Sequence, residues 1–207
     1  SDEDKEGDIA KGDGDFIVGS LLPQTGSLAF LGPPEIAGVN LAVEEINEAG
    51  GVLGKDVVHV DADSGDADSA IAPAETDKLI KAKADVIVGA ASSGVSLLVI
   101  DKILKSGTVM ISPANTSTAF DEDPYDKPDL YFRTAPSDVL QGAVMANLLI
   151  EDGRKNVAIM ARQDSYGQVL AEQVKKGLED AGVKVAVTTQ YGEKAKNYDT
   201  EIGEVVA

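Results

Sequence analysis

The sequence contains no cysteine and no tryptophan, and aromatic residues make up only 4% of its 207 positions. Without cysteine, the chain forms neither disulfides nor thiolate metal sites. With so few aromatic side chains, the core has to be built from valine, isoleucine, leucine and alanine. The apolar runs are all much shorter than the ~20 residues that span a bilayer, so we expect no part of this sequence inside a membrane.

Basic residues are also scarce, with 18 Lys and Arg against 36 Asp and Glu, which gives a formal charge of −18. This balance argues against nucleic acid as a partner, because phosphate binding needs clustered positive charge. Residues 1–15 hold seven of the acidic side chains and three glycines. We expect a flexible acidic tail there, which is either an exposed terminus or the spacer of an exported protein whose leader has been removed.

Short apolar runs alternate with longer amphipathic segments from residue 16 onward. The runs are continuous, as expected for parallel strands that are covered on both faces. Strand, helix and strand in repetition predict a doubly wound α/β fold with parallel sheets. The expected strands are residues 16–22, 57–60, 86–88, 109–111, 157–160 and 183–187.

The expected helices have recognisable ends. Prolines at a first turn begin a helix near residue 33, and paired glycines end it at residue 50. Asp66 is a suitable N-cap for a helix over 67–83, and Ser92 or Ser93 for one over 95–105. Further helices are expected at 137–151, at 167–181 and after residue 198.

A proline-containing segment, residues 115–136, interrupts the alternation and includes only a short apolar run at 131–133. We interpret it as an excursion followed by a crossover. The sequence then divides into a tail (1–15), a first lobe with four strands (16–134) and the beginning of a second lobe (135–207). The second lobe has only two strands, so we expect the chain to be an N-terminal fragment.

Ligands of open α/β sheets bind beyond the carboxyl ends of the strands. The loops that follow the strands here are small and rich in hydroxyl groups, which lets a ligand approach free N–H groups at helix N-termini. Ser92 and Ser93, before the third helix, are candidates for holding an anion such as a carboxylate. The alternatives stay open, because both serines are ordinary helix caps and Thr116 is an ordinary turn residue. The loops are residues 23–27, 89–94, 112–118 and 164–167.

The sequence lacks the motifs of several common enzyme and metal-binding sites. No dinucleotide-binding G-x-G-x-x-G follows the first strand, and no phosphate-binding P-loop is present. His59 is the only histidine and lies within an expected strand, so we assign it a structural role. The acidic residues at positions 61, 63, 66 and 68 do not fit an EF-hand; we expect Asp66 to cap its helix and the others to be solvated. The sequence predicts no catalytic residue, metal or cofactor.

Several segments, in this order, resemble the branched-chain amino-acid-binding family of solute-binding proteins. Each segment is weak evidence alone, but the ordered set covers nearly the whole chain from residue 16. The segments are residues 22–26, 31–33, 42–54, 89–93, 111–116, 132–134 and 164–167.

The resemblance implies a type I periplasmic-binding fold, in which two lobes close on a small-molecule ligand. It implies no enzyme activity but delivery of an amino acid, branched-chain or otherwise hydrophobic, to the membrane permease of an ABC transporter, outside the cytoplasm. A ligand-sensing domain of a receptor or regulator with the same fold, or a binder of amides, urea or aromatic acids, remains an alternative.

The resemblance also assigns roles to the polar loop residues. Ser93 would bind the ligand carboxylate through its hydroxyl, together with the backbone N–H of Thr116. The carbonyl of Ala114 and the hydroxyl of Thr116 would hold the ammonium. In the family, an acidic residue that also pairs with the ammonium lies farther along than residue 207.

Three further residues are implied around the ligand side chain. Tyr166, from the second lobe, would close over the ligand. Leu31 occupies the position where the family has an aromatic residue, and the neighbouring Phe30 could take over that contact. The departure at Leu31 leaves the side-chain preference open.

Overall fold

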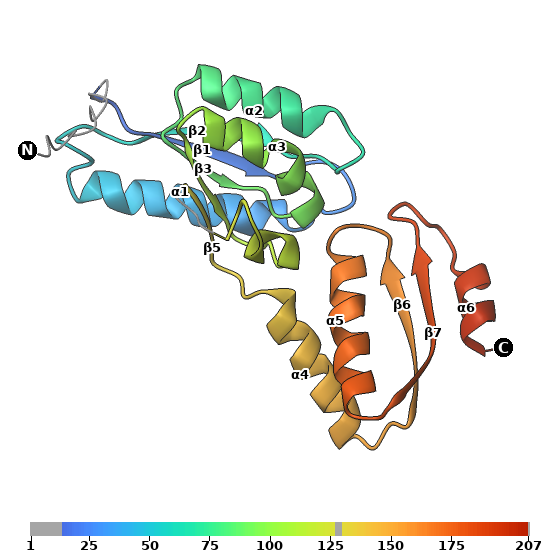
Figure 1. The fold of residues 1–207 in the computed structure, drawn as a ribbon. Helices are drawn as coiled ribbons and strands as arrows, with labels where there is room; N and C mark the ends of the chain where they lie inside the picture. The colour runs from blue at the N-terminus through green and yellow to red at the C-terminus, as the bar shows by residue number, and fades with distance from the viewer. Residues whose placement is uncertain (1–13, 127–129, 207) are drawn as a thin grey trace, which may run out of the picture.

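The structure is a computed structural model that describes residues 14–126 and 130–206 (Figure 1). The chain forms two separate sheets, each flanked by helices, and passes once between them at residues 134–137. We call β1–β5 with α1–α3 the first lobe, and α4–α6 with β6 and β7 the second lobe. The predicted tail, residues 1–15, lies outside the described residues apart from its last two positions. Dividing the chain after residue 134 remains our proposal.

The first lobe contains a five-stranded parallel sheet, so the expectation of four strands is wrong. The additional strand is β5, which continues the sheet beside β4 with Tyr131 opposite Met110. Tyr131 is buried and stacks on Phe120 with ring centroids 5.0 Å apart, which explains why a short run between prolines still joins the sheet. The order is β2-β1-β3-β4-β5. The strands are β1 (Ile17–Leu22), β2 (Val58–Asp63), β3 (Val86–Gly89), β4 (Val109–Ser112) and β5 (Tyr131–Arg133).

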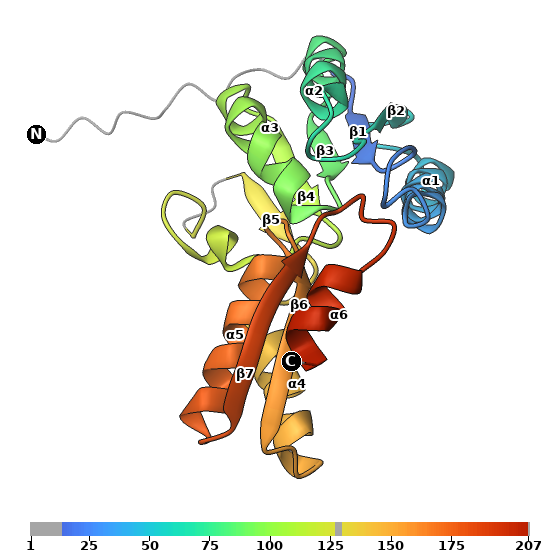
Figure 2. The same cartoon turned by 90° about the vertical axis from the view of Figure 1, so that its right-hand side faces the viewer.

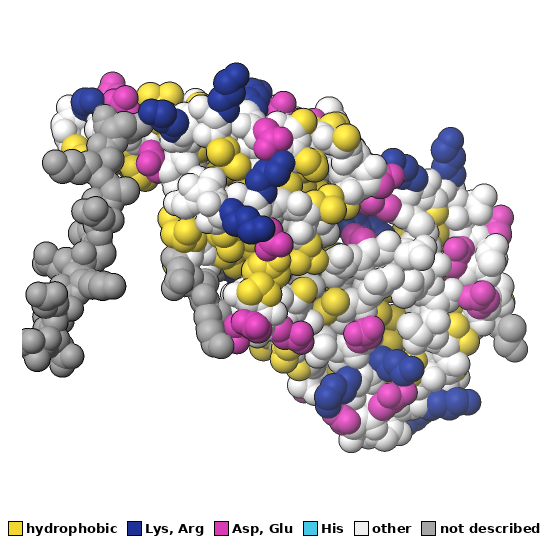
Figure 3. Space-filling view, turned by 45° about the horizontal axis from the view of Figure 1, so that its top comes forward, with side chains coloured by type: hydrophobic (Ala, Val, Ile, Leu, Met, Phe, Trp, Pro, Cys, Tyr) yellow, Lys and Arg dark blue, Asp and Glu magenta, His cyan; other side chains and the backbone are white. Residues whose placement is uncertain are grey.

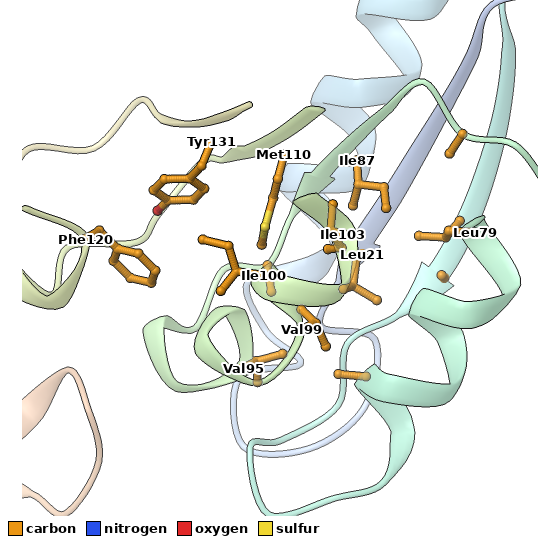
Figure 4. Close-up of a cluster of buried hydrophobic side chains, with 14 residues drawn as sticks. Leu21, Leu79, Ile87, Val95, Val99, Ile100, Ile103, Met110, Phe120 and Tyr131 are labelled. Atoms are coloured by element: carbon orange, nitrogen blue, oxygen red, sulfur yellow. The ribbon is translucent and has the colours of Figure 1, made fainter. Parts of the chain in front are cut away.

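Helices cover both faces of this sheet, as the continuous apolar runs predict (Figure 1). Alternate residues of β1 point to opposite faces. Leu21 packs in the cluster beneath α2 and α3, which Figure 4 shows, whereas Val18 and Leu22 pack with Val39 of α1. The helices are α1 (Gly32–Glu48), α2 (Ile71–Lys81) and α3 (Ser93–Lys105), and a short 3-10 turn η1 (Thr118–Asp121) precedes β5.

Helix α2 begins at Ile71, later than predicted, and Asp66 does not cap it. The Asp66 carboxylate instead accepts hydrogen bonds from the backbone N–H and the hydroxyl of Ser27, at 2.8 and 3.0 Å. Its side chain is therefore committed to the loop after β1. A cap signal in sequence cannot distinguish these two uses, because the competing donors lie 39 residues away.

The second lobe follows its predicted elements closely. Its two strands are parallel, and α5 buries Val174 and Leu178 against Ala146 of α4 and Val183. The elements are α4 (Asp138–Glu151), β6 (Asn156–Arg162), α5 (Gly167–Asp180), β7 (Lys184–Tyr191) and α6 (Asp199–Val206).

No helix of the described residues is long and apolar enough to cross a membrane. On the face drawn in Figure 3, lysine and arginine side chains are interspersed with acidic ones rather than gathered in one basic area.

Candidate functional site

A cavity of about 690 Å³ lies between the two lobes, at the carboxyl ends of the first sheet's strands. The lining is mostly apolar, and the hydroxyl groups of Ser92, Ser93 and Thr116 come to it from the first lobe. From the first lobe the cavity is lined by Leu28, Leu31, Ala91, Ser92, Ser93, Ala114 and Thr116. From the second lobe the lining includes Gln141, Met145, Leu149, Arg162, Tyr166, Leu170 and Tyr191.

The two serines at the start of α3 have different tasks. Ser92 is the N-cap and its hydroxyl accepts the N–H of Val95 at 3.4 Å. Ser93 is the first residue of the helix and is only 2% exposed. Its hydroxyl oxygen accepts the backbone N–H groups of Thr116 and Ser117, both at 3.3 Å, so the hydroxyl proton is left to donate. A ligand carboxylate is a suitable acceptor for that proton.

The two loops that carry these groups are held together by Asn115. Its side-chain amide donates to the carbonyls of Ala90 and Ala91, both at 3.1 Å, and its oxygen accepts the hydroxyl proton of Tyr131. Asn115 is fully buried. The loop after β3 and the loop after β4 are therefore fixed to one another and to β5, which keeps Ser93 close to Thr116.

A glycine ends β3 because the loop approaches β1 very closely. Gly89 has a φ of +136°, and a Cβ there would lie 2.1 Å from the carbonyl oxygen of Leu21. Only glycine fits both the conformation and the space. The loop thus begins directly beside β1, and this places Ala91 and Ser92 on the cavity.

Thr116 is bonded twice to Asp138, the first residue of α4. The Thr116 hydroxyl donates to the Asp138 carboxylate at 3.1 Å, and the Asp138 N–H donates to the Thr116 carbonyl at 2.7 Å. Burial raises the pKa of Asp138, and the Thr116 hydrogen bond and the charge of Arg133 only partly oppose this rise. A candidate site residue of the first lobe is thereby joined to the first helix of the second lobe.

Among the acidic residues around β2, Asp63 organises the loop after β1, whereas Asp61 and Asp68 are exposed, as predicted. Asp63 accepts the N–H groups of Gln24, Thr25 and Gly65. Burial of Asp63 favours its neutral form, but these bonds and the Thr25 hydroxyl outweigh burial and lower its pKa. Asp61 accepts the Ser20 hydroxyl. No group of three or more acidic or histidine side chains in the described part of the chain is arranged to hold a metal ion.

The two apolar candidates after β1 are placed differently. Leu31 lines the cavity, together with Leu28, which the sequence did not single out. Phe30 is 72% exposed and is not among the lining residues. In this arrangement Phe30 does not take the place of an aromatic residue at position 31.

The chain matches the family described as periplasmic binding protein over residues 17–207. It belongs to that family. A leucine-, isoleucine-, valine-, threonine- and alanine-binding protein of Pseudomonas aeruginosa is 32% identical over 184 residues, which are 88% of this chain and 48% of that protein. The chemotactic signal transduction system substrate-binding protein BasB of Halobacterium salinarum is 33% identical over 165 residues, 75% of this chain and 39% of that protein.

Among solved structures, the substrate-binding protein LivJ of the branched-chain amino acid transporter of Streptococcus pneumoniae was determined in complex with isoleucine. It is 25% identical and superposes with a TM-score of 0.80 over 93% of this chain and 54% of its own. The fold is thus that of type I periplasmic binding proteins. The chain spans about half the length of the curated relatives it matches. The matches named here are binding proteins, not enzymes.

In this periplasmic binding protein, Tyr166 faces the cavity from the turn before α5. Its hydroxyl lies 3.4 Å from the side-chain amide of Gln141, which donates to it. Asp164 of the same turn accepts the N–H of Gly167 at 2.6 Å and pairs with Arg162. Asp164 therefore holds the turn that presents Tyr166, and its charge is balanced by Arg162.

Gln141, Arg162 and Tyr191 line the cavity but were not predicted from the sequence. Arg162 and Tyr191 end β6 and β7, so the same rule of carboxyl strand ends would have found them. Gln141 lies at the end of the first turn of α4, where no strand end points to it.

His59 lies apart from this cavity. Its two ring nitrogens are hydrogen-bonded to Ser20 at 2.9 Å and Asn40 at 2.8 Å, which joins β1, β2 and α1. Those contacts give it a structural role in the first lobe.

Proposed function

We propose that this periplasmic binding protein binds a small α-amino acid with an apolar side chain in the cavity between its lobes. The observation that supports the proposal most directly is that the cavity is lined by both hydrogen-bonding groups and apolar side chains. Ser93 and Thr116 are hydrogen-bonded to each other and, with Ala114, we take them as the polar end of the site, whereas Leu31 and Met145 contribute apolar surface to the lining. A small ligand with a polar group at one end and an apolar side chain at the other fits such a site. The relatives support this choice, since one is named for leucine, isoleucine, valine, threonine and alanine and another holds isoleucine.

The proposed contacts follow from which groups can donate and which can accept. The Ser93 hydroxyl donates to the ligand carboxylate, assisted by the positive end of the α3 dipole. The N–H of Thr116 is bonded to Ser93 at 3.3 Å, a length at which it is readily shared with a ligand oxygen. The Ala114 carbonyl and the Thr116 hydroxyl accept from the ammonium. Ser92 supports the site as the cap of α3, and Tyr166 closes over the ligand.

The protein then acts outside the cytoplasm and presents its closed, loaded form to the membrane permease of an ABC transporter. Closure brings the second lobe against the ligand by rotation about the crossing at residues 134–137. Binding and release are the whole proposed activity, and no chemical change of the ligand is part of it. Turnover of a bound amino acid would contradict this proposal.

The proposal is tested by screening amino acids against the full-length protein by thermal shift, since a ligand that binds only the native state raises the melting temperature. Isothermal titration then measures the affinity of the variants Ser93→Ala and Thr116→Ala. We expect each to weaken binding by about tenfold or more, the effect of losing a hydrogen bond to a charged group.

Thr188→Ala is the matched control for these variants. Thr188 is exposed on β7 and lies outside the cavity lining, so its loss should leave the affinity unchanged. If Ser93→Ala and Thr116→Ala bind as tightly as the control variant, the assignment of the polar end is wrong.

A second candidate function is ligand sensing, in which the loaded protein reports to a receptor rather than a permease. It is favoured by BasB, whose name places it in a chemotactic signal transduction system. The ligand site would be the same, and the membrane partner would differ. Cross-linking of the loaded protein to its membrane partner in intact cells, followed by identification of that partner, decides between the two.

A further inference from the structure

Asp138 is a buried carboxylate at the point where the chain enters the second lobe. Its side chain has no exposed surface. One carboxylate oxygen accepts the Thr116 hydroxyl at 3.1 Å, while the other, Oδ1, has no hydrogen-bond partner among the described residues. An unpaired buried carboxylate is costly, so its presence at this position calls for a reason.

Helix capping does not supply the reason. Ser137 is the N-cap of α4, and its hydroxyl accepts the N–H of Val139 at 3.3 Å. An ion pair does not supply it either, because no cation is paired with Asp138 in the part of the chain that the structure describes. The nearby Arg133 is bonded to Asp121 and to the carbonyl of Ser117.

What Asp138 does determine is the direction of the Thr116 hydrogen bond. A threonine hydroxyl has one proton, and an ionised carboxylate can only accept. The proton of Thr116 is therefore committed to Asp138, and the remaining lone pairs of its oxygen can only accept from a ligand. Ser93 is the opposite case, because its oxygen already accepts two N–H groups and its proton is free to donate.

We propose that Asp138 is a positioning residue that turns the Thr116 hydroxyl into an obligate acceptor and thereby selects ligands that carry an α-ammonium group. The inference deepens the proposed function and rests on it. An ammonium donates to Thr116 and is attracted by the buried negative charge behind it. An α-hydroxy acid of the same shape brings only a neutral group, and a simple carboxylic acid brings no donor at all.

The test compares leucine with its α-hydroxy analogue, 2-hydroxy-4-methylpentanoate, by isothermal titration on the full-length protein. The variant Asp138→Asn keeps the size of the side chain and can still accept the Thr116 hydroxyl, but it removes the charge. We expect leucine to bind about tenfold more weakly to this variant. The affinity for the hydroxy acid should stay the same or increase, so the ratio of the two affinities falls.

Asp101→Asn is the matched control, because Asp101 is bonded to Tyr125 on the first lobe and does not line the cavity. For Asp101→Asn, the ratio of the affinities for leucine and the hydroxy acid should equal that of the wild type. The melting temperature without ligand gives a second readout. Asp138→Asn should not lower it, since the substitution removes a buried charge.

The outcomes separate this inference from the proposed function. If Asp138→Asn weakens both ligands equally, Asp138 is only structural and the inference is overturned. An unchanged ratio, or a wild type that binds the hydroxy acid as tightly as leucine, overturns it as well, while the proposed cavity stands. A wild type that binds neither ligand contradicts the proposed function and the inference together. A fall in the ratio for Asp138→Asn alone supports the assignment.

Discussion

The side chain of Asn115 makes three hydrogen bonds inside the first lobe and has no exposed surface. Truncating it would leave the hydroxyl of Tyr131 and the carbonyl of Ala91 without that partner in a buried place. Each unsatisfied group costs about 1–3 kcal/mol. We therefore expect Asn115→Ala to lower the free energy of unfolding by about 2–4 kcal/mol, measured by urea denaturation.

The matched control for this variant is Asn156→Ala, because Asn156 is exposed at the start of β6. Its cost should stay within about 0.5 kcal/mol. Equal effects of the two substitutions would mean that Asn115 does not hold the loops together. Isothermal titration should show weaker ligand binding for Asn115→Ala only, because the loops that Asn115 joins carry Ser93 and Thr116.

At the scale of single residues, the sequence predicted which residues lie on the cavity better than it predicted their hydrogen-bond partners. Hydroxyl groups in loops after strands pointed to Ser93 and Thr116, and both lie on the cavity. The prediction that Asp66 caps a helix was wrong, because its carboxylate accepts hydrogen bonds from Ser27 in another loop. The roles of Asn115 and Asp138 were not predicted, because each depends on a partner more than fifteen residues away that only the folded chain brings close. The ligand contacts themselves stay predictions.

At the scale of elements, the loop after β3 depends on the backbone of Gly89. An added Cβ would require a strained φ and would meet the Leu21 carbonyl at 2.1 Å, so β3 and β1 would have to separate. We expect Gly89→Ala to lower the free energy of unfolding by more than about 2 kcal/mol in urea denaturation. It should also weaken ligand binding, because the loop 90–93 would be displaced.

Gly38→Ala provides the comparison for Gly89→Ala. Gly38 lies within α1, and nothing stands within 4 Å of its added Cβ. Alanine there should raise stability by up to about 1 kcal/mol through helix propensity alone. Two substitutions of the same kind are thus expected to act in opposite directions, and a tolerated Gly89→Ala would contradict the close approach of β3 to β1.

The order of helices and strands was predictable because apolar runs and helix-ending glycines are local signals. Two elements departed from expectation for non-local reasons. Strand β5 forms because Tyr131 packs between Met110 and Phe120, although its run is only three residues long. Helix α2 starts late because the segment before it is used by the loop after β1. Local patterns therefore predict which elements exist, and tertiary contacts decide where they begin.

At the scale of the whole molecule, the lobes are joined by more than the single crossing of the chain. The loop after β7 reaches the first lobe (Figure 2), where Glu193 accepts the Ser27 hydroxyl at 2.9 Å and Lys194 pairs with Asp68 at 2.7 Å. Both contacts bring the lobes together beside the cavity. They stabilise the arrangement of the two lobes seen in the structure, and their loss should favour separation of the lobes.

The Lys194–Asp68 pair is exposed, so its removal by Lys194→Met should have little effect on the stability of the fold. Because the proposed function has the two lobes close on the ligand, we expect an affinity loss of about two- to fivefold at low salt, measured by isothermal titration. The difference from wild type should vanish near 1 M salt, where charges are screened within about 3 Å.

Lys102→Met is the control, since Lys102 and Asp77 form an exposed pair of similar length, 2.8 Å, within the first lobe alone. Because that pair does not connect the lobes, its loss should leave affinity and its salt dependence unchanged. Equal effects of the two variants would show that the cross-lobe contact does not contribute to closure.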